Sequence, residues 1–474
     1  MLKKTKIVAT IGPATEDRKI LENLALAGLD AVRLNFSHGD FAEHQKRLDS
    51  VRFVSKKIGK TIAVIQDLGG PKIRIGDFYK SSIVLKNGQS FILSAEKCAG
   101  DENKVFVNYK NLPKELKKGS KILLNDGKNE LRVEKISGND IYCRVIVGGE
   151  IKGRRGVNLP GTFLKISSLT EKDKQDIKFG IKNKVDFMAV SFVRQAADVI
   201  ELKNILKKAN ANIKVIAKIE TQEAIEMIDE IIAAADGILV ARGDLAVEIS
   251  PEKVPMAQKM IIRKCNAKGK PVITATQMLE SMVRSPIPTR AEVNDIANAI
   301  LDGTDAVMLS EETALGDFPL KAVEVMARVA LYTEEGFNYG GERVKDNFSL
   351  EAIGDSVSFA VVNVACNIGA SAIFALTESG FTARMISRCK PRQPVIALTP
   401  NKQTCNWLAI SFGCYPRLIN GFKDIAEVSE AAKKMALADK IAKKGGKIVI
   451  SAGIPFGKAG TTNLLLAETV WFCD

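Results

Sequence analysis

The sequence predicts an α/β protein: a (β/α)8 TIM barrel with an inserted small β-barrel lid domain and a C-terminal open α/β domain. Three observations predict this architecture. Eight short, β-rich apolar runs recur up to residue 313, amphipathic helical stretches separate most of them, and the alternation restarts after about residue 345. A chain of 474 residues, 46% of them hydrophobic, has room for two to four domains of roughly 100 to 200 residues each.

The eight apolar runs are the predicted strands of the barrel. They occupy segments 6–12, 31–37, 61–68, 187–193, 213–220, 237–244, 271–277 and 306–313. Stretches such as "DRKILENLALAG" and "QAADVIELKNILKKA" separate them, with the apolar spacing expected of crossover helices.

One interval departs from this alternation and predicts the inserted domain. Between the third and fourth runs, closely spaced strand signals are punctuated by the turn sequences "KNG", "NDG", "SGND" and "VGGE". The C-terminal segments "SAIFALTESGFTARMISRCKPRQPVIALTPN" and "GGKIVISAGIPFG" indicate an open α/β domain. The predicted bounds are 1–70 and 161–345 for the barrel, 71–160 for the lid, and 346–474 for the C-terminal α/β regulatory domain.

Composition narrows the function. No apolar stretch reaches the roughly 18 residues that span a membrane, and the N-terminus shows no cleavage pattern, so we expect a cytoplasmic protein with no membrane partner. Eight scattered cysteines without a C-x-x-C pair argue against metal knuckles and a disulfide framework. The net charge of +14 comes from lysines dispersed over helix faces, and aromatic residues are only 6%, so we expect no nucleic-acid partner.

Polar residues at the ends of two neighbouring runs indicate a metal and substrate site. Lys218 and Glu220 are two residues apart and face the same side of a strand, and Asp244 ends the next run. Active sites of such barrels lie at the C-terminal ends of the strands. Carboxylate oxygens suit Mg²⁺ or Mn²⁺ rather than zinc. The alternative is a buried ion pair between Lys218 and Glu220.

The second run adds three polar side chains on one strand face, namely Arg33, Asn35 and Ser37, followed by His38. Because buried polar groups need partners, three inward polar positions favour a ligand site over a core. Ordinary cap and turn residues are the alternative. We expect His44, the other histidine, to lie on the surface.

Hydroxyl groups follow the seventh and eighth runs. Thr276 and Ser310 could relay a proton, although capping a helix N-terminus is the commoner role of such residues. Thr289 and Glu292 have the spacing of a capping box, to which we assign a structural role.

Longer motifs carry a family resemblance. In chain order they are "TKIVATIGPA", "RLNFSHG", "DLGGPKIR", "RRGVNLPG", "SLTEKDKQDI", "AKIET", "GILVARGDLAVEI", "PVITATQMLESM", "PTRAEVNDIANAILDGTDAVMLSEETALGDFP" and "TESGFTA". With these motifs the chain resembles the pyruvate kinase family from residue 5 to the C-terminal domain. Two departures concern the positioning of substrate: Ala246 stands where a glycine is usual, and Glu311 where a glycine or alanine often precedes the second acid.

The resemblance implies transfer of the phosphoryl group of phosphoenolpyruvate to ADP. It also implies an assembly of four identical chains, a homotetramer. It assigns the metal to Glu220 and Asp244, the transferring group to Lys218, and the phosphate to Arg33. Backbone N–H groups of Gly243 and Asp244 would hold the carboxylate, and a water network touching Thr276 and Ser310 would protonate the enolate. ADP would be bound under the closing lid by Thr10, Pro13, Asn35, His38, Arg74 and Arg155.

Two other classes of function remain open at this point. One is another Mg²⁺-dependent barrel enzyme of 2-oxo acid chemistry, an aldolase or lyase, which would not need ADP. The other is a catalytically silent metabolite sensor, whose mark would be the loss of Lys218, Glu220 or Asp244. None of the three is lost.

The C-terminal stretch "TESGFTARMISR" predicts an effector site for a phosphorylated sugar or AMP. A strand ends and a helix begins there, which offers hydroxyls and free backbone N–H groups to a phosphate from Thr377, Ser379, Gly380 and Thr382. Glu378 argues against a bisphosphate. A plain capped turn is the alternative.

The stretch "DLGGPKIRIG" bears on monovalent cations. The resemblance implies that Asn35, Ser37, Asp67 and the carbonyl of residue 68 stand where the family has a K⁺ site. Members of the family that need K⁺ usually read "DTKGPEIR" over the stretch that begins at residue 67. Here Leu68 and Lys72 stand at the changed positions. A tethered ammonium can supply the charge of K⁺ without the entropic cost of capturing an ion, so we predict that K⁺ is not required. The alternative is a solvated lysine.

Overall fold

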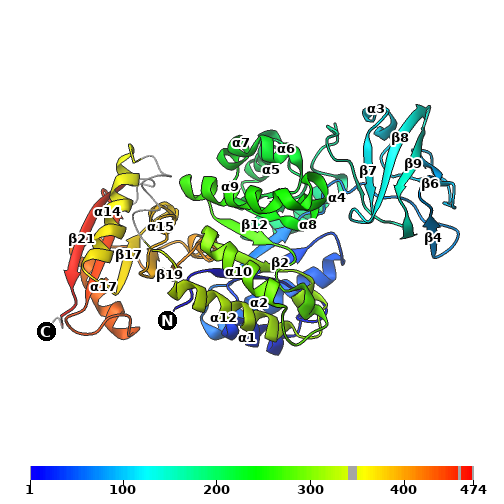
Figure 1. Cartoon of the computed structure of the whole chain (residues 1–474). Coiled ribbons are helices and arrows are strands. Elements are labelled where there is room, and N and C mark those ends of the chain that lie inside the picture. Colours follow the sequence, from blue (N-terminus) through cyan, green and yellow to red (C-terminus); the bar gives the residue numbers. More distant parts are fainter. Residues whose placement is uncertain (1, 340–349, 457–460, 472–474) are drawn as a thin grey trace.

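The computed structural model describes residues 2–339, 350–456 and 461–471. Three parts lie in a row in Figure 1, with the barrel between the lid at one end and the C-terminal domain at the other. The lid leaves the barrel after its third strand and returns before its fourth. It therefore extends from the end of the barrel at which the strands terminate.

The barrel is closed by eight parallel strands in the order β1-β16-β15-β14-β13-β12-β3-β2. The strands are β1 (Lys6–Thr10), β2 (Ala31–Asn35), β3 (Ala63–Asp67), β12 (Phe187–Val190), β13 (Lys214–Ile219), β14 (Gly237–Ala241), β15 (Val272–Ala275) and β16 (Ala306–Leu309). Each lies within one of the eight predicted runs, so the predicted barrel is confirmed.

Helices surround the barrel because their apolar faces pack on the outer sides of the strands. They are α1 (Arg18–Ala27), α2 (Phe41–Ile58), α4 (Glu171–Lys182), α5 (Ala196–Lys208), α6 (Gln222–Glu226), α7 (Ile228–Ala234), α8 (Arg242–Ile249), α9 (Val254–Ala267), α10 (Arg290–Asp302), α11 (Glu311–Ala314) and α12 (Pro319–Glu335), with short 3₁₀ turns at η1 (Pro251–Lys253) and η2 (Glu280–Val283). Small residues such as Ala31 and Ala63 fill the barrel interior beside larger ones such as Ile65. The predicted capping box of Thr289 and Glu292 begins α10.

The lid is built from antiparallel pairs and one parallel pair. Its elements are β4 (Ser82–Leu85), β5 (Ser90–Ser94), β6 (Lys104–Phe106), α3 (Leu112–Glu115), β7 (Lys121–Leu124), β8 (Asn129–Ser137), β9 (Asp140–Val147), β10 (Gly149–Lys152) and β11 (Val157–Asn158). They form a six-stranded sheet and a two-stranded sheet around a separate apolar core. The lid therefore has a hydrophobic core distinct from that of the barrel.

The C-terminal domain is a five-stranded sheet in the order β19-β18-β17-β20-β21, parallel except for its last strand. Its elements are α14 (Ile353–Asn367), β17 (Ala372–Leu376), α15 (Phe381–Ser387), β18 (Val395–Thr399), α16 (Lys402–Leu408), β19 (Cys414–Leu418), α17 (Ile425–Ala438), β20 (Lys447–Gly453) and β21 (Thr462–Thr469). Apolar cores cover both faces of the sheet, which confirms the predicted open α/β domain. The boundary predicted at residues 345/346 lies outside the described residues.

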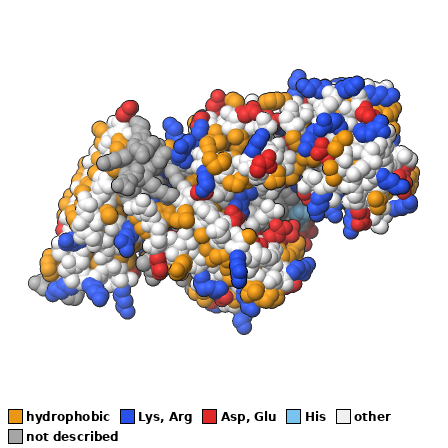
Figure 2. All heavy atoms as spheres, viewed as in Figure 1, with side chains coloured by type: hydrophobic (Ala, Val, Ile, Leu, Met, Phe, Trp, Pro, Cys, Tyr) orange, Lys and Arg blue, Asp and Glu red, His pale blue; other side chains and the backbone are white. Residues whose placement is uncertain are grey.

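The surface carries its positive charge on all three parts. Figure 2 shows lysine and arginine side chains scattered over one face of the molecule, most densely on the lid. No helix among the described residues is long and apolar enough to cross a membrane. The seven cysteines within the described ranges are all free thiols.

Candidate active site

The candidate site lies where the barrel strands end and the lid begins. A cavity of about 780 Å³ is lined there by Lys121 and Asp126 of the lid and by Gly243, Asp244 and Gln277 of the barrel. Both protein parts therefore contribute walls to one cleft, and a change in the position of the lid would change its volume.

Lys218 is the central cation of the site. Its Nζ lies 2.8 Å from Glu220 Oε1 and 3.4 Å from Asp67 Oδ1, and it donates a hydrogen bond of 2.7 Å to Ser191 Oγ. Burial by itself would lower the pKa of Lys218, but the two carboxylates raise it above its ordinary value. The ammonium is therefore charged at every physiological pH.

Arg33 is fixed beside Lys218 by the same aspartate. Its Nε donates to Asp67 Oδ2 at 2.7 Å, its Nη2 lies 2.6 Å from that oxygen, and its Nη1 donates to Thr10 Oγ1 at 3.1 Å. Burial would raise the pKa of Asp67, but Lys218 and Arg33 hold it below its ordinary value. Asp67 thus stays ionised and orients two cations toward the strand ends.

Glu220 and Asp244 form a pair of carboxylates suited to a divalent cation. Burial raises the pKa of Glu220, and the negative charge of Asp244 raises it further, so the two groups repel each other. A divalent cation shared between them would remove this repulsion, and oxygen donors suit Mg²⁺ or Mn²⁺. Among the described residues, no three His, Cys, Asp or Glu side chains gather as a ready-made metal site. Other ligands must therefore come from substrates, water or backbone.

Asp244 differs in placement from its prediction at the end of a strand. The strand β14 ends at Ala241, and Asp244 lies in the first turn of α8. A carboxylate in the first turn is favoured by the helix dipole. Glu220 likewise lies one residue beyond β13, where its Oε2 accepts a hydrogen bond of 2.6 Å from the Phe192 backbone.

Thr276 has an unusual backbone. It follows β15 with φ of 66°, a left-handed conformation that β-branched residues rarely adopt. Arg242 holds it there by donating to the carbonyls of Ala275 and Thr276 at 3.2 and 2.7 Å. The Thr276 hydroxyl accepts the Gly243 N–H at 2.8 Å, so this predicted carboxylate donor is already engaged.

Ser310 occupies the N-cap position of α11, without a capping hydrogen bond from its side chain. Its backbone N–H donates at 2.6 Å to Glu312, which is buried. The two departures from the family motifs lie near these elements: Glu311 is exposed at the start of α11, and Ala246 is half-buried in α8.

The residues predicted to bind ADP fall into two groups. Thr10, at the end of β1, is buried against Arg33. Pro13 follows β1, Asn35 is the last residue of β2, and His38 follows β2. Arg74 lies on the chain segment that leads from β3 into the lid, and Arg155 lies within the lid between β10 and β11, next to Gly156, with which Arg74 pairs in an antiparallel bridge. The second group therefore comes from the lid and its connection to the barrel.

The predicted monovalent-cation residues are only partly gathered. Asn35 Oδ1 accepts the N–H of Ser37, whose side chain is exposed, and the Leu68 carbonyl accepts a hydrogen bond from Ser191. Lys72 Nζ lies 3.8 Å from Asp244 Oδ1. The lysine therefore approaches the carboxylate of the metal pair.

His44 was expected on the surface, and this expectation is wrong. Its side chain is buried in α2, stacked on Phe36 with ring centroids 3.9 Å apart, and its Nε2 lies 2.9 Å from the His38 carbonyl. Burial lowers the pKa of His44, which favours the neutral ring. His44 is therefore buried because its ring stacks on an aromatic side chain, although histidine is a polar residue.

Three residues that the sequence reasoning missed hold the site together: Ser191 beside Lys218, Arg242 behind Thr276, and Glu248 at the base of the lid. Glu248 accepts a hydrogen bond of 3.0 Å from the Asn158 side chain. Burial raises the pKa of Glu248 to about 7. The motif "ARGD" and the polar residue inside the otherwise apolar fourth run were the available signals for Arg242 and Ser191.

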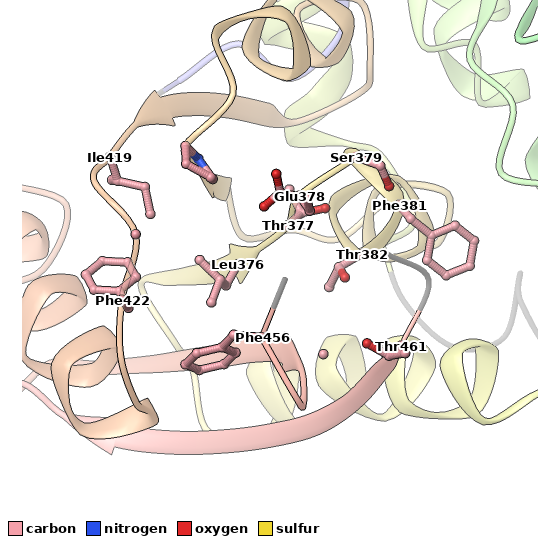
Figure 3. Close-up of a pocket in the computed structure, with 13 residues that line it drawn as sticks. Leu376, Thr377, Glu378, Ser379, Phe381, Thr382, Ile419, Phe422, Phe456 and Thr461 are labelled. Carbon is pink, nitrogen blue, oxygen red and sulfur yellow. The ribbon is translucent and has the colours of Figure 1, made fainter. Parts of the chain in front are cut away.

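A second cavity, of about 320 Å³, lies in the C-terminal domain (Figure 3). Thr377, Ser379 and Thr382 line it, and the Thr382 hydroxyl lies 2.7 Å from that of Thr462. Gly380 has φ of 82° at the start of α15. Figure 3 shows Ile419 and Phe422 toward one side of the cavity, and Ser379, Thr382 and the ring of Phe381 toward the other.

These features define a class of protein: a barrel enzyme that brings a lysine, an arginine and paired carboxylates together for an anionic substrate and a divalent cation. Comparison with known proteins supplies the family. A model described as "Pyruvate kinase, barrel domain" matches residues 2–323, and one described as "Pyruvate kinase, alpha/beta domain" matches residues 355–466.

Curated relatives agree over almost the whole chain. A pyruvate kinase of Staphylococcus saprophyticus is 46% identical over 474 residues, which is 99% of this chain and 81% of the relative. Pyruvate kinases of Staphylococcus aureus and Staphylococcus epidermidis are each 45% identical over 473 residues, with the same coverage. The chain belongs to the pyruvate kinase family. It is a phosphotransferase, and its reaction transfers the phosphoryl group of phosphoenolpyruvate to ADP.

Proposed function

We propose that Lys218 and Arg33 carry this phosphoryl transfer at the strand ends of the barrel. The observation that carries the proposal is the contact of the Lys218 ammonium with Asp67 and Glu220, because it fixes a permanent positive charge beside a second cation. Phosphoryl transfer depends mainly on positioning and on neutralisation of charge. Lys218 would face the transferring group, and Arg33 would bind the phosphate.

Glu220 and Asp244 would hold the divalent cation, Mg²⁺ or Mn²⁺. The mutual repulsion of these carboxylates supports this assignment. The bound cation would supply positive charge to the phosphate and carboxylate oxygens. Asp244 would also offer its backbone N–H, together with that of Gly243 once Thr276 releases it.

Protonation of the enolate after transfer is assigned to a water network that touches Thr276 and Ser310. The hydroxyl of Thr276 is held at the strand end by its strained backbone. ADP would enter between the barrel and the lid. The residues that would bind it are Thr10, Pro13, Asn35, His38, Arg74 and Arg155. Closure of the lid would then exclude water from the site.

The decisive experiment is a coupled assay of pyruvate formation with phosphoenolpyruvate, ADP and Mg²⁺. We expect activity that disappears on chelation of the metal and falls at least a thousandfold in Lys218→Met. Lys80→Met, at an exposed lid position that pairs with Glu102 and does not line the cleft, is the matched control and should retain most of the rate. An aldolase or lyase would act without ADP, and a silent sensor would bind phosphoenolpyruvate without turnover; either result would refute the proposal.

We also propose that catalysis does not require K⁺, because Lys72 provides a tethered ammonium beside Asp244. The remaining members of the predicted cation site are Asn35, Ser37, Asp67 and the Leu68 carbonyl.

The cavity of the C-terminal domain is proposed as an effector site for a phosphorylated sugar or AMP. The hydroxyls of Thr377, Ser379 and Thr382 would bind the phosphate, and the loop at Gly380 would allow its close approach. Glu378 disfavours a second phosphate. A panel of sugar phosphates and AMP at sub-saturating phosphoenolpyruvate should reveal a change in apparent affinity that Thr382→Glu abolishes. No response to any member of the panel would refute this assignment.

The family also leads us to propose a homotetramer in the cytoplasm. Free thiols throughout the described cysteines are consistent with a reducing compartment. Sedimentation equilibrium of the purified chain would test the assembly, and a mass other than four chains would contradict it.

A further inference from the structure

Ser191 lies between the ends of β3 and β13, two strands that contribute residues to the candidate site. It directly follows β12, which lies between β3 and β13 in the closed barrel. The residue after β3 is Leu68, and β13 carries Lys218. The side chain of Ser191 is buried, with only 2% of its surface exposed. Its hydroxyl can therefore reach both neighbours without competition from bulk water.

The direction of the two hydrogen bonds is fixed by the chemistry of the groups. Ser191 donates its single proton to the Leu68 carbonyl at 2.7 Å, since a carbonyl can only accept. Its lone pairs then face the Lys218 ammonium, which donates to Ser191 Oγ at 2.7 Å. A one-way chain thus runs from the ammonium through the hydroxyl to the loop that precedes Lys72.

Ser191 also differs from the other partners of Lys218 in carrying no charge. The ammonium has three protons, and its remaining contacts are to the carboxylates of Glu220 at 2.8 Å and Asp67 at 3.4 Å. Without the hydroxyl, one N–H would lose its acceptor and the ammonium could close on Asp67, the more distant carboxylate. The neutral hydroxyl of Ser191 therefore fixes the direction of the Lys218 ammonium without neutralising its positive charge, which the substrate needs.

We propose that Ser191 is a positioning residue for phosphoryl transfer, which orients the Lys218 ammonium and ties it to the Leu68 carbonyl. The inference rests on the proposed role of Lys218. It assigns a function to a buried serine that does not itself touch the reacting atoms. The side chain of Ser191 packs closely on the loop that follows β3, because a Cβ built on Gly70 would meet Ser191 Cβ at 2.9 Å.

The test compares kcat and the KM values of Ser191→Ala with those of Ser411→Ala. Ser411 is a matched control, because it is also buried but its hydroxyl has no hydrogen-bond partner among the described residues. For Ser191→Ala we expect kcat to fall at least tenfold while KM for ADP stays within twofold, and for Ser411→Ala we expect the wild-type kcat. Ser191→Cys keeps a side chain with a weaker acceptor, and its kcat should fall at least fivefold.

The outcomes separate this inference from the proposed function. If Lys218→Met is inactive but both Ser191 variants keep kcat within twofold of wild type, the positioning role is overturned and the role of Lys218 stands. If Lys218→Met itself retains activity, the proposed function fails. Should Ser191→Ala fail to fold, by loss of its thermal unfolding transition, the Cys variant decides: a wild-type kcat overturns the proposal and a fivefold loss supports it.

Discussion

Reversal of the charge at Lys72 should create a dependence on K⁺. The Lys72 ammonium lies 3.8 Å from Asp244, so Lys72→Glu replaces an attraction by a repulsion at the same place. Two unit charges about 4 Å apart interact by about 1 kcal/mol in water and about 4 kcal/mol at an effective dielectric of 20. The side chains are 37% and 33% exposed, which places the value toward the lower end.

A loss of about 1 kcal/mol of attraction and a gain of about 1 kcal/mol of repulsion add to roughly 2 kcal/mol. Since about 1.4 kcal/mol corresponds to a factor of ten, the rate of Lys72→Glu without K⁺ should fall by between ten- and a hundredfold. Lys72→Met removes only the attraction and should lose about half as much on a logarithmic scale. A cation captured from solution would offset the new negative charge, so K⁺ should restore the rate of the Glu variant.

Initial rates in buffer free of sodium and potassium, with a tetraalkylammonium salt maintaining ionic strength, measure this effect. Lys80→Glu is the control for charge reversal on the lid, because Lys80 is exposed and pairs with Glu102 instead of lining the cleft. A wild-type rate that rises tenfold or more on addition of K⁺ would refute the reasoning. So would a Lys72→Glu variant that K⁺ fails to restore.

Two further predictions concern pH and packing. Burial raises the pKa of Glu248 to about 7, so the folded chain binds its proton more tightly than the unfolded chain and loses this stabilisation as pH rises from about 4.5 to 7. Glu248→Gln should therefore raise the midpoint of thermal unfolding more at pH 8 than at pH 5. The control is Glu252→Gln, at an exposed position, which should shift the midpoint equally at both pH values. An equal shift at both pH values in Glu248→Gln would contradict the argument. Gly70 and Gly59 both have φ near 65°, but an added Cβ would meet another atom, Ser191 Cβ at 2.9 Å, only at Gly70. Gly70→Ala should therefore lower the midpoint of thermal unfolding further than Gly59→Ala. Equal losses in the two variants would show that crowding at Gly70 is unimportant.

The barrel was predictable because the strand runs are short, apolar and regularly separated by helical patterns. The ends of the runs were less accurate. The run ending at Asp244 continues three residues beyond the end of β14, because polar residues after a buried strand can begin a helix directly. A first-turn carboxylate is favoured there by the helix dipole, which a search for strand periodicity does not detect.

Candidate residues could be predicted by position, but their partners could not. Strand ends converge in any such barrel, which was enough to bring together Arg33, Lys218 and Glu220. The pairing of Lys72 with Asp244 depends on how the connection to the lid leaves the barrel, and that path is not encoded in a periodic pattern. His44 shows another limit, because hydropathy treats histidine as polar while its ring can stack on a buried phenylalanine.

Ser191 shows how more of the site could have been deduced. In sequence it lies far from Leu68, but the lid accounts for most of that separation, and without it β3 and β12 are consecutive strands of the barrel. Consecutive strands of a (β/α)8 barrel are neighbours, so residues at the C-terminal ends of β3, β12 and β13 must lie side by side. A small polar residue at the middle of these three positions can bridge a carbonyl on one side and a lysine on the other. In this chain that rule selects Ser191, because the fourth run is apolar until it reaches this serine.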